Sequence, residues 1–276
     1  MTDLAFGLPE VSAWAQFSGD YNPIHFDLHK ARSAGLDGLV VHGMLASLPI
    51  KAALTDGTGA AASRWMKYHG VFRKPIPHGS SSLLTLQASR TSGLGFRLNA
   101  REGQEERLRG GYAPAPEQGG WLAAHAADQL RFSPLAEGDA ERFLQSYPTV
   151  QEGWIVLDAI VFADFIRTKL DAIALKVRQE FPGAMGAAPE RAVFVQVSHT
   201  VFIDTQALRT PGPLPFSPRQ LSYAMAAPDI IADPDKVLGS VSLPIVHGQD
   251  LVMRIEIGLL ARPETQQPPR NPGSLQ

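Results

Sequence analysis

The stretch Phe17-Ser18-Gly19-Asp20-Tyr21-Asn22-Pro23-Ile24-His25-Phe26-Asp27 lies between two segments with helical periodicity. Gly19 and Pro23 are residues that interrupt regular structure, so the stretch is predicted to be a turn-rich loop. Pro23 also disfavours the helical conformation at Asn22, which extends the backbone just before His25. If the loop folds back at Asn22-Pro23, the side chains of Asp20 and His25 come together.

An aspartate and a histidine in one loop can activate a water molecule, because one group accepts a proton while the other donates one. Further along the chain, Val40-Val41-His42-Gly43-Met44 leads from an apolar run into a helical pattern. A backbone N–H at the start of a helix can stabilise a developing oxyanion. Together the loop and the Gly43 amide indicate chemistry next to a carbonyl group.

The order and spacing of these residues also resemble a known family signature. The pattern Ser18-Gly19-Asp20-x-Asn22-Pro23-x-His25-x-Asp27 is followed by Ala31, Gly35 and Val41-His42-Gly43-Met44, and later by Phe72-Arg73-Lys74-Pro75-Ile76 and Gly79. Over roughly residues 10–112 the chain is similar to the MaoC-like (R)-specific enoyl-CoA hydratases and 3-hydroxyacyl thioester dehydratases.

The resemblance implies a hotdog fold and reversible hydration of trans-2-enoyl thioesters, as in fatty acid metabolism. It implies Asp20 and His25 as the catalytic pair, the Gly43 amide as the oxyanion hole, and Asn22 and His42 as supporting residues. The substrate would be a thioester of coenzyme A or of acyl carrier protein. No metal and no organic cofactor are expected.

Composition sets outer limits on the function. The 276 residues are 44% apolar and 19% charged, with a net charge of −2 and no cysteine. This balance is typical of globular proteins and gives no electrostatic case for a nucleic-acid partner. Disulfides, thiol nucleophiles and thiolate-held metals are excluded. The N-terminus has no signal-peptide pattern and no apolar run is long enough for a membrane span, so a soluble cytoplasmic protein is expected.

In the first half, short helices are expected over Val11–Phe17, with Ser12 as N-cap, and over Asp27–Gly35. A longer helix is expected over Met44–Leu54, where Pro49 should cause a kink. Four strands are then predicted at Trp65–Arg73, Ser82–Ser89, Gly95–Arg101 and Arg107–Ala113. A long helix followed by an antiparallel meander is the hotdog arrangement.

The second half repeats this pattern of elements without repeating the sequence. One long amphipathic helix is predicted over Ile155–Phe181. Four strands follow, at Ala192–Ile203, Gln220–Ala226, Val237–Val246 and Leu251–Ala261. We therefore predict an α+β double hotdog, with units at residues 1–115 and 121–262 and a mobile tail at 263–276. The second unit lacks the Asp/His signature, so one active site per chain is expected.

Several residues have a second interpretation. Asp20 and His25 could be ordinary turn residues. His25-x-Asp27-x-His29 has spacing that could bind a metal on a strand, but here a proline turn precedes it and a helix follows, so Asp27 is expected to cap that helix. His42 could be a second base, although packing beside the helix start is the favoured interpretation.

Two other functions stay open. Hotdog thioesterases usually carry a carboxylate on the central helix, and Met44–Leu54 contains none. A non-catalytic acyl-thioester binding protein is the other alternative, against which the intact Asp20/His25 pair argues. In several fused relatives the signature lies in the C-terminal half, whereas here it is N-terminal, which leaves the acyl chain length open. Hotdog units usually pair because the site lies between them, and fusing two units meets that need within one chain. A homodimer of the fused chain stays open.

Overall fold

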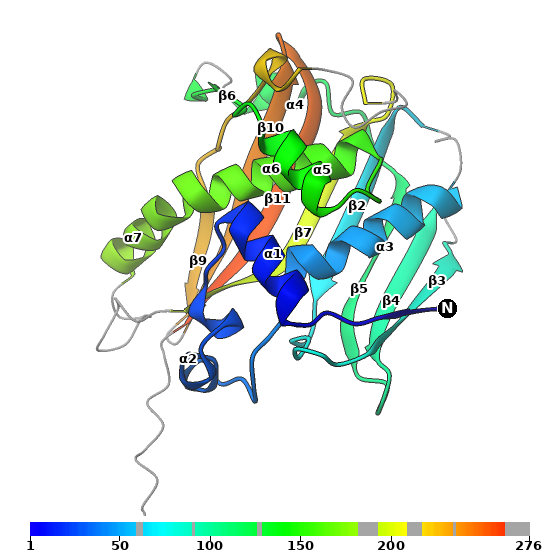
Figure 1. Cartoon of the computed structure of the whole chain (residues 1–276). Helices are drawn as coiled ribbons and strands as arrows, with labels where there is room; N and C mark the ends of the chain where they lie inside the picture. Colours follow the sequence, from blue (N-terminus) through cyan, green and yellow to red (C-terminus); the bar gives the residue numbers. More distant parts are fainter. Residues whose placement is uncertain are drawn as a thin grey trace, which may run out of the picture.

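The computed structural model describes residues 1–58, 63–89, 92–125, 129–181, 193–208, 217–233 and 236–262. The tail expected at 263–276 lies outside these residues. In the described part, eleven strands form a single sheet in the order β1-β3-β4-β5-β2-β7-β11-β10-β8-β6, and β9 adds to β10. The helices α1, α3, α5 and α6 lie together on one face of this sheet (Figure 1).

The first half of the chain supplies one side of the sheet. Its elements are β1 (Thr2–Leu4), α1 (Leu8–Ser18), a 3-10 turn (Pro23–His25), α2 (Leu28–Ser33), α3 (Gly43–Thr58), β2 (Trp65–Phe72), β3 (Ser82–Ala88), β4 (Leu94–Ala100) and β5 (Glu106–Pro114).

The second half supplies the other side. Its elements are α4 (Trp121–Ala124), β6 (Ser133–Pro134), α5 (Asp139–Ser146), α6 (Gly153–Thr168), α7 (Leu170–Glu180), β7 (Val193–Asp204), a 3-10 turn (Pro218–Gln220), β8 (Leu221–Tyr223), β9 (Asp229–Asp233), β10 (Lys236–His247) and β11 (Asp250–Arg262).

The two halves have the same connectivity. In each, the strand that follows the central helix pairs with the last strand of its half: β2 pairs with β5, and β7 pairs with β11. The halves meet where β2 and β7 run antiparallel, with Tyr68 opposite Val201. The fold is therefore the predicted double hotdog, with its two sheets joined edge to edge.

The start of α1 and the end of α3 differ from the prediction. Ser12 is not the N-cap of α1, because the helix begins at Leu8 after Gly7, and the Glu10 carboxylate accepts the Gly7 N–H at 2.8 Å. Pro9 is pre-shaped for a first helical turn, which explains the earlier start. Helix α3 continues past Leu54 to Thr58 and contains Pro49 in its interior.

The single helix predicted over Ile155–Phe181 is instead two consecutive helices. Lys169 interrupts them with backbone angles φ −121° and ψ −29°. In the residue just before this break, the Thr168 hydroxyl donates to the Asp164 carbonyl at 2.8 Å. A hydroxyl that bonds to the carbonyl four residues back competes with the helical backbone and often bends a helix.

Helix α6 is buried on all sides in its first three turns. Every residue from Gly153 to Ala163 is buried, because the sheet covers one side of the helix while α1 and α5 pack on the others (Figure 1). A helix buried all round needs no polar face. This explains the almost uninterrupted apolar run, in which Asp158 is the exception.

Five short elements were not predicted, because a short segment gives no clear periodicity: β1, β6, β9, α4 and α5. None of the described helices combines the length and the apolar character that crossing a bilayer requires.

Candidate active site

The loop between α1 and α2 is held in shape by its own side chains. Gly19 ends α1 with φ 77°, and a Cβ there would lie 2.6 Å from Cγ of Arg167, so a side chain does not fit. Asn22 accepts the Ile24 N–H at 3.3 Å and donates through Nδ2 to the Phe194 carbonyl at 2.9 Å. Asn22 therefore ties the loop to β7 of the second half.

Asp27 behaves as predicted. Its carboxylate accepts the backbone N–H groups of His29 at 2.8 Å and Lys30 at 3.0 Å, which caps α2. The possible metal set His25-x-Asp27-x-His29 does not form. In the part of the chain that the structure describes, the metal-capable cluster is Asp20, His25 and His42 instead.

In this cluster, the ligand-type atoms of the three side chains lie within 4.8 Å of one another. The rings of His25 and His42 stack with their centroids 3.6 Å apart. His25 Nδ1 donates to the Val40 carbonyl at 2.7 Å, which leaves Nε2 with its lone pair. His42 Nε2 donates to the Asp20 carbonyl at 2.9 Å. A water molecule bridging Asp20 and His25 would fit such a separation.

The same contacts decide against His42 as a ligand or base. Its Nε2 is engaged with the Asp20 backbone, and its Nδ1 is buried without a hydrogen-bond partner. His42 is absent from the cavity wall, whereas Asp20 and His25 both line the cavity. A metal would therefore find two available protein ligands here, the Asp20 carboxylate and His25 Nε2, which suits a held water better than a metal ion.

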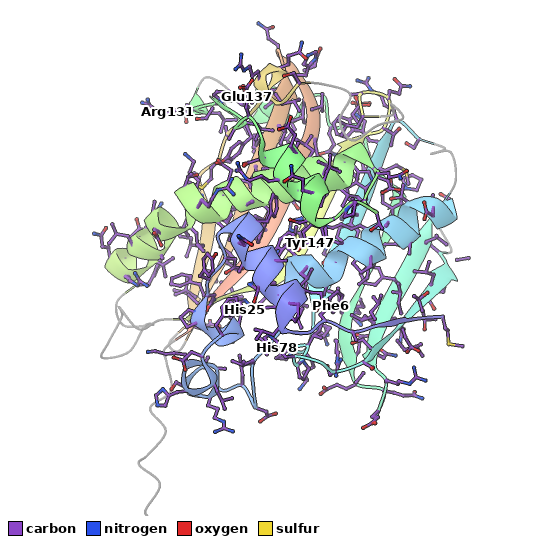
Figure 2. The ribbon with its side chains drawn as sticks, viewed as in Figure 1. Phe6, His25, His78, Arg131, Glu137 and Tyr147 are labelled. Carbon is purple, nitrogen blue, oxygen red and sulfur yellow. The ribbon has the colours of Figure 1, made fainter. Side chains whose placement is uncertain are left out.

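The Val40 carbonyl accepts hydrogen bonds from both His25 and a third histidine. His78, from the segment between β2 and β3, lies close to His25 (Figure 2) and donates through Nε2 to the same Val40 carbonyl at 3.0 Å. Val40 is fixed in turn by a bridge to Pro77. Sequence reasoning gave no role to His78, because residues 40 and 78 become neighbours only through the tertiary fold.

Burial shifts the pKa values of the cluster toward the uncharged forms. Desolvation raises the pKa of the Asp20 carboxyl, although the charge of His25 opposes this. Desolvation also lowers the pKa of His25, against the charge of Asp20. It lowers the pKa of His42 to about 3, with the charge of His25 acting in the same direction. A neutral His42 therefore stacks on His25 without adding charge.

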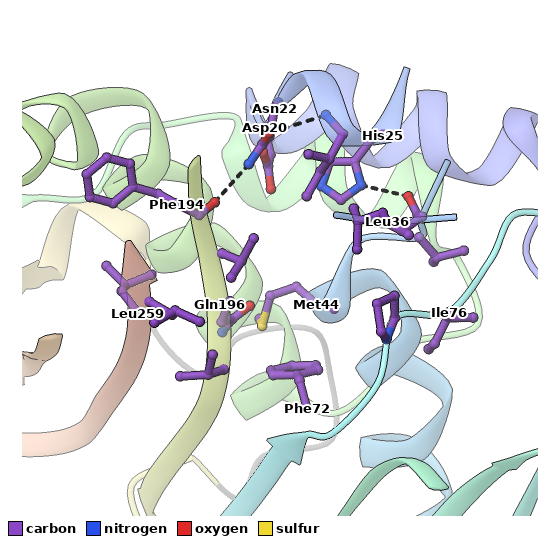
Figure 3. Close-up of a pocket in the computed structure, with 18 of the residues that line it drawn as sticks. Asp20, Asn22, His25, Leu36, Met44, Phe72, Ile76, Phe194, Gln196 and Leu259 are labelled. Atoms are coloured by element: carbon purple, nitrogen blue, oxygen red, sulfur yellow. Dashed lines mark hydrogen bonds between the residues drawn. The ribbon is translucent and has the colours of Figure 1, made fainter. Parts of the chain in front are cut away.

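The two halves of the chain together enclose a cavity of about 230 Å³ (Figure 3). Asp20, His25, Gly43 and Phe72 line it from the first half, and Phe194, Gln196 and Leu259 line it from the second. Gly43 is the first residue of α3, so its N–H has no acceptor within the helix. A Cβ at Gly43 would lie 2.6 Å from Cε1 of Phe72, which explains the need for glycine.

A second group of polar residues beside the cavity was not found by sequence reasoning. Lys51 on α3, Asp158 on α6 and His199 on β7 are fully buried and bonded in a row. His199 continues to Gln196 in the cavity wall. The signal in the sequence was Asp158 itself, a carboxylate inside an apolar helix, which requires a partner when buried.

Comparison with known proteins finds a family match in the first half of the chain. Residues 9–104 match the family model described as MaoC like domain. The mitochondrial 3-hydroxyacyl-[acyl-carrier-protein] dehydratase of Arabidopsis thaliana is 35% identical over 83 residues, which are 30% of this chain and 49% of that protein. The match therefore spans about half the length of that curated relative.

Among solved structures, a MaoC-like dehydratase covers 93% of this chain and 94% of its own, with 12% identity and a TM-score of 0.50, and this likeness concerns the fold alone. An (R)-hydratase from A. caviae is 26% identical and covers 42% of this chain and 92% of its own, with a TM-score of 0.33. The family match over residues 9–104 includes the Asp20–His25 loop and Gly43.

Proposed function

We propose that this protein catalyses the reversible hydration of trans-2-enoyl thioesters, and the dehydration of (R)-3-hydroxyacyl thioesters, carried on coenzyme A or acyl carrier protein. One observation carries the proposal: Asp20, His25 and the Gly43 amide line one cavity. The first two can hold and deprotonate a water, and the third can stabilise the oxyanion that its addition creates. The likeness of the MaoC-like domain to a dehydratase supports the same reaction.

In the hydration direction, a water held between Asp20 and His25 Nε2 adds its oxygen to the β-carbon. One of its protons passes to the Asp20/His25 pair, and the electron pair of the double bond moves toward the thioester carbonyl. The Gly43 N–H stabilises the enolate oxygen. The pair then delivers a proton to the α-carbon. Because the two groups are close enough to titrate together, the role of base belongs to the pair.

The thioesterase alternative has three candidate carboxylates on the central helices, but none is suitably placed. Asp164 on α6 accepts a hydrogen bond from Tyr223 and does not line the cavity. Asp56, which belongs to α3 because that helix extends to Thr58, is exposed and does not line the cavity. Asp158 on α6 is fully buried and bonded to both Lys51 and His199. A carboxylate neutralised in this way cannot attack or deprotonate a nucleophile for a substrate in the cavity.

The proposal predicts that crotonyl-CoA is hydrated, measured as loss of the absorbance of the conjugated thioester, and a chain-length series then gives the preferred acyl group. Asp20→Asn should slow hydration by roughly a hundred- to ten-thousandfold, because an amide cannot accept the proton. His25→Ala should cause a comparable loss. The double variant should lose little more, since the two residues act on one water.

The matched control is Asp27→Asn, which changes an exposed carboxylate on the same loop and keeps a good helix cap. It should retain the parent rate. Retention of turnover within about threefold by a folded Asp20→Asn variant would refute the proton-transfer role. Binding of an enoyl thioester without any turnover would instead favour the non-catalytic binding protein.

A further inference from the structure

Gln196 faces the cavity because of an irregularity in β7. Gln196 pairs with Leu259 of β11, Ser198 pairs with Gly258, and Val197 is left as an extra residue in a bulge. Cross-strand partners share a face of the sheet, and Leu259 belongs to the hydrophobic core. Gln196 is therefore turned to the same inner face as His199. Without the bulge it would point outward with Ser198, since side chains alternate along a strand.

A buried chain of hydrogen bonds holds the Gln196 amide from behind. Lys51 Nζ bonds to the Asp158 carboxylate, and Asp158 Oδ1 accepts from His199 Nε2 at 2.8 Å. The other ring nitrogen of His199, Nδ1, lies 3.1 Å from Gln196 Nε2. Lys51, Asp158 and His199 are all 0% exposed, so the chain is shielded from water.

Charge balance fixes the direction of each hydrogen bond in the chain. Burial alone would raise the pKa of Asp158, but His199 and Lys51 outweigh it and lower that pKa to about 2. Desolvation lowers the pKa values of both Lys51 and His199. The lysine is the group that keeps its proton, because its ordinary pKa is 10.5 and that of an imidazole is 6.5. One ammonium paired with one carboxylate leaves the cluster neutral, and a second buried cation would be costly. His199 is thus neutral, its Nε2–H donates to Asp158, and its Nδ1 accepts from the Gln196 amide nitrogen.

It follows that the Gln196 carbonyl oxygen, for which no hydrogen bond is seen among the described residues, can accept one inside the cavity. Figure 3 shows Gln196 projecting from β7 toward Met44, with the apolar side chains of Phe72 and Leu259 nearby. The proposed reaction uses Asp20, His25 and Gly43 and gives Gln196 no task. In the part of the wall that the second half supplies, Gln196 is the one polar residue among those described. An oriented polar group among apolar side chains can fix a ligand and select it.

We propose that Gln196 is a specificity-determining residue whose carbonyl oxygen, oriented by Lys51, Asp158 and His199, accepts a hydrogen bond from an O–H or N–H group of the bound thioester. The inference rests on the proposed function for the class of ligand. The donor has two possible sources: a hydroxyl group on the acyl chain, or an amide N–H of the carrier arm. A site that hydrogen-bonds such a group rejects an analogue that lacks it.

The test compares Gln196→Leu, which keeps the size of the side chain and removes the acceptor, with the parent. The control Thr200→Val removes a hydroxyl on the same strand that bonds to His69 on the opposite face. All variants are compared by calorimetric binding in an Asp20→Asn background, in which the proposed dehydration of 3-hydroxybutyryl-CoA is suppressed. Affinity is thereby read separately from turnover. The three ligands are butyryl-CoA, 3-hydroxybutyryl-CoA and S-ethyl thiobutyrate, which has no amide.

Gln196→Leu should weaken binding of the ligand with the recognised donor by about tenfold or more, and leave the others and the Thr200→Val control unchanged. A loss confined to 3-hydroxybutyryl-CoA assigns the acyl hydroxyl. A loss for both CoA ligands, but not for S-ethyl thiobutyrate, assigns the carrier amide.

Equal affinities for parent and Gln196→Leu, or an equal loss for all three ligands, would overturn the inference. The experiments distinguish a failure of the Gln196 inference from a failure of the proposed reaction. An enzyme that hydrates crotonyl-CoA with no Gln196 dependence refutes this inference alone, whereas a Gln196-dependent affinity without turnover refutes the reaction alone. A folded protein that binds none of the three ligands refutes both.

Discussion

His42 is the residue at which burial and acid sensitivity are most directly linked. Its ring is 2% exposed and stacks on His25, and desolvation lowers its pKa to about 3. In an unfolded chain the pKa of histidine is about 6.5. Between these two pH values the unfolded state binds a proton that the folded state does not. The free energy of unfolding therefore falls as the pH drops below about 6.5.

We predict that lowering the pH to about 5 removes about 2 kcal/mol of stability through His42 alone, since each pH unit below 6.5 costs about 1.4 kcal/mol. His25 and His199 act in the same direction, because burial lowers their pKa values too. Thermal melting at about pH 7.5 and about pH 5 should give a smaller difference in Tm for His42→Asn than for the parent.

The comparison depends on the difference between the two pH values, so a general destabilisation by the substitution does not affect it. His29→Asn, an exposed histidine on α2, is the matched control and should leave the difference unchanged. The same pH sensitivity in His42→Asn as in the parent would mean that His42 is protonated in the folded state.

At the level of elements, the start of α3 determines where the thioester oxygen can be stabilised. Gly43 offers an N–H with no helical acceptor, and the ring of Phe72 occupies the position that a Cβ would need. Two substitutions separate these features. Gly43→Ala adds the Cβ and keeps the N–H, whereas Gly43→Pro adds the Cβ and removes the N–H.

We predict that hydration by Gly43→Pro is roughly a hundred- to a thousandfold slower than by Gly43→Ala, which is the usual effect of losing one oxyanion donor. Both variants share the contact with Phe72, and proline is tolerated at the first position of a helix, so their melting temperatures should be similar. Equal rates in two folded variants would show that the oxyanion is stabilised elsewhere.

The connection before the central helix explains why one site per chain is expected. In the first half, residues 19–42 separate α1 from α3 and carry the Asp20–His25 loop, whereas only residues 147–152 separate α5 from α6. At the start of α6, Trp154 stacks on Tyr112 with ring centroids 5.8 Å apart and donates to Thr55 Oγ1 at 3.2 Å. Aromatic side chains thus occupy the start of α6, and within the described residues no long loop precedes this helix to carry an acid/base pair.

At the scale of the whole molecule, the Lys51–Asp158 pair is a fully buried ion pair between the two halves. Lys51 comes from α3 and Asp158 from α6, and both are fully buried. Removing one partner of a buried ion pair leaves an uncompensated charge, while replacing both by apolar residues removes that cost. The pair is therefore expected to specify how the halves dock more than to stabilise them.

We predict that Lys51→Met lowers the free energy of unfolding by about 3 to 5 kcal/mol, and that adding Asp158→Leu restores most of the loss. In the double variant His199 lacks its acceptor, so the free energy of unfolding should stay about 1 to 3 kcal/mol below that of the parent. Chemical denaturation of the parent, the single and the double variant measures these values. A double variant less stable than the single one would mean that the pair makes a net stabilising contribution.

The sequence by itself determined the elements that depend on local pattern. The loop at Gly19–Pro23, the cap at Asp27 and most long strands follow from turn chemistry and period-two alternation, which neighbouring residues alone can encode. The double hotdog followed from the repeated order of one helix and several strands. Asp20, His25 and Gly43 could be named as one site because the family that the chain resembles has the corresponding residues in one site. The division at residues 115–121 and the roles of these residues remain predictions.

Only the tertiary structure decided which distant residues meet. The break at Lys169, the bulge at Val197 and the inward turn of Gln196 depend on packing between layers. Lys51, Asp158 and His199 lie on three elements and form a chain because a buried charge must find a partner wherever the fold places one. Local pattern specifies helices and strands. Which polar side chains lose their contact with water, and therefore need a partner, depends on how the two halves pack around the cavity.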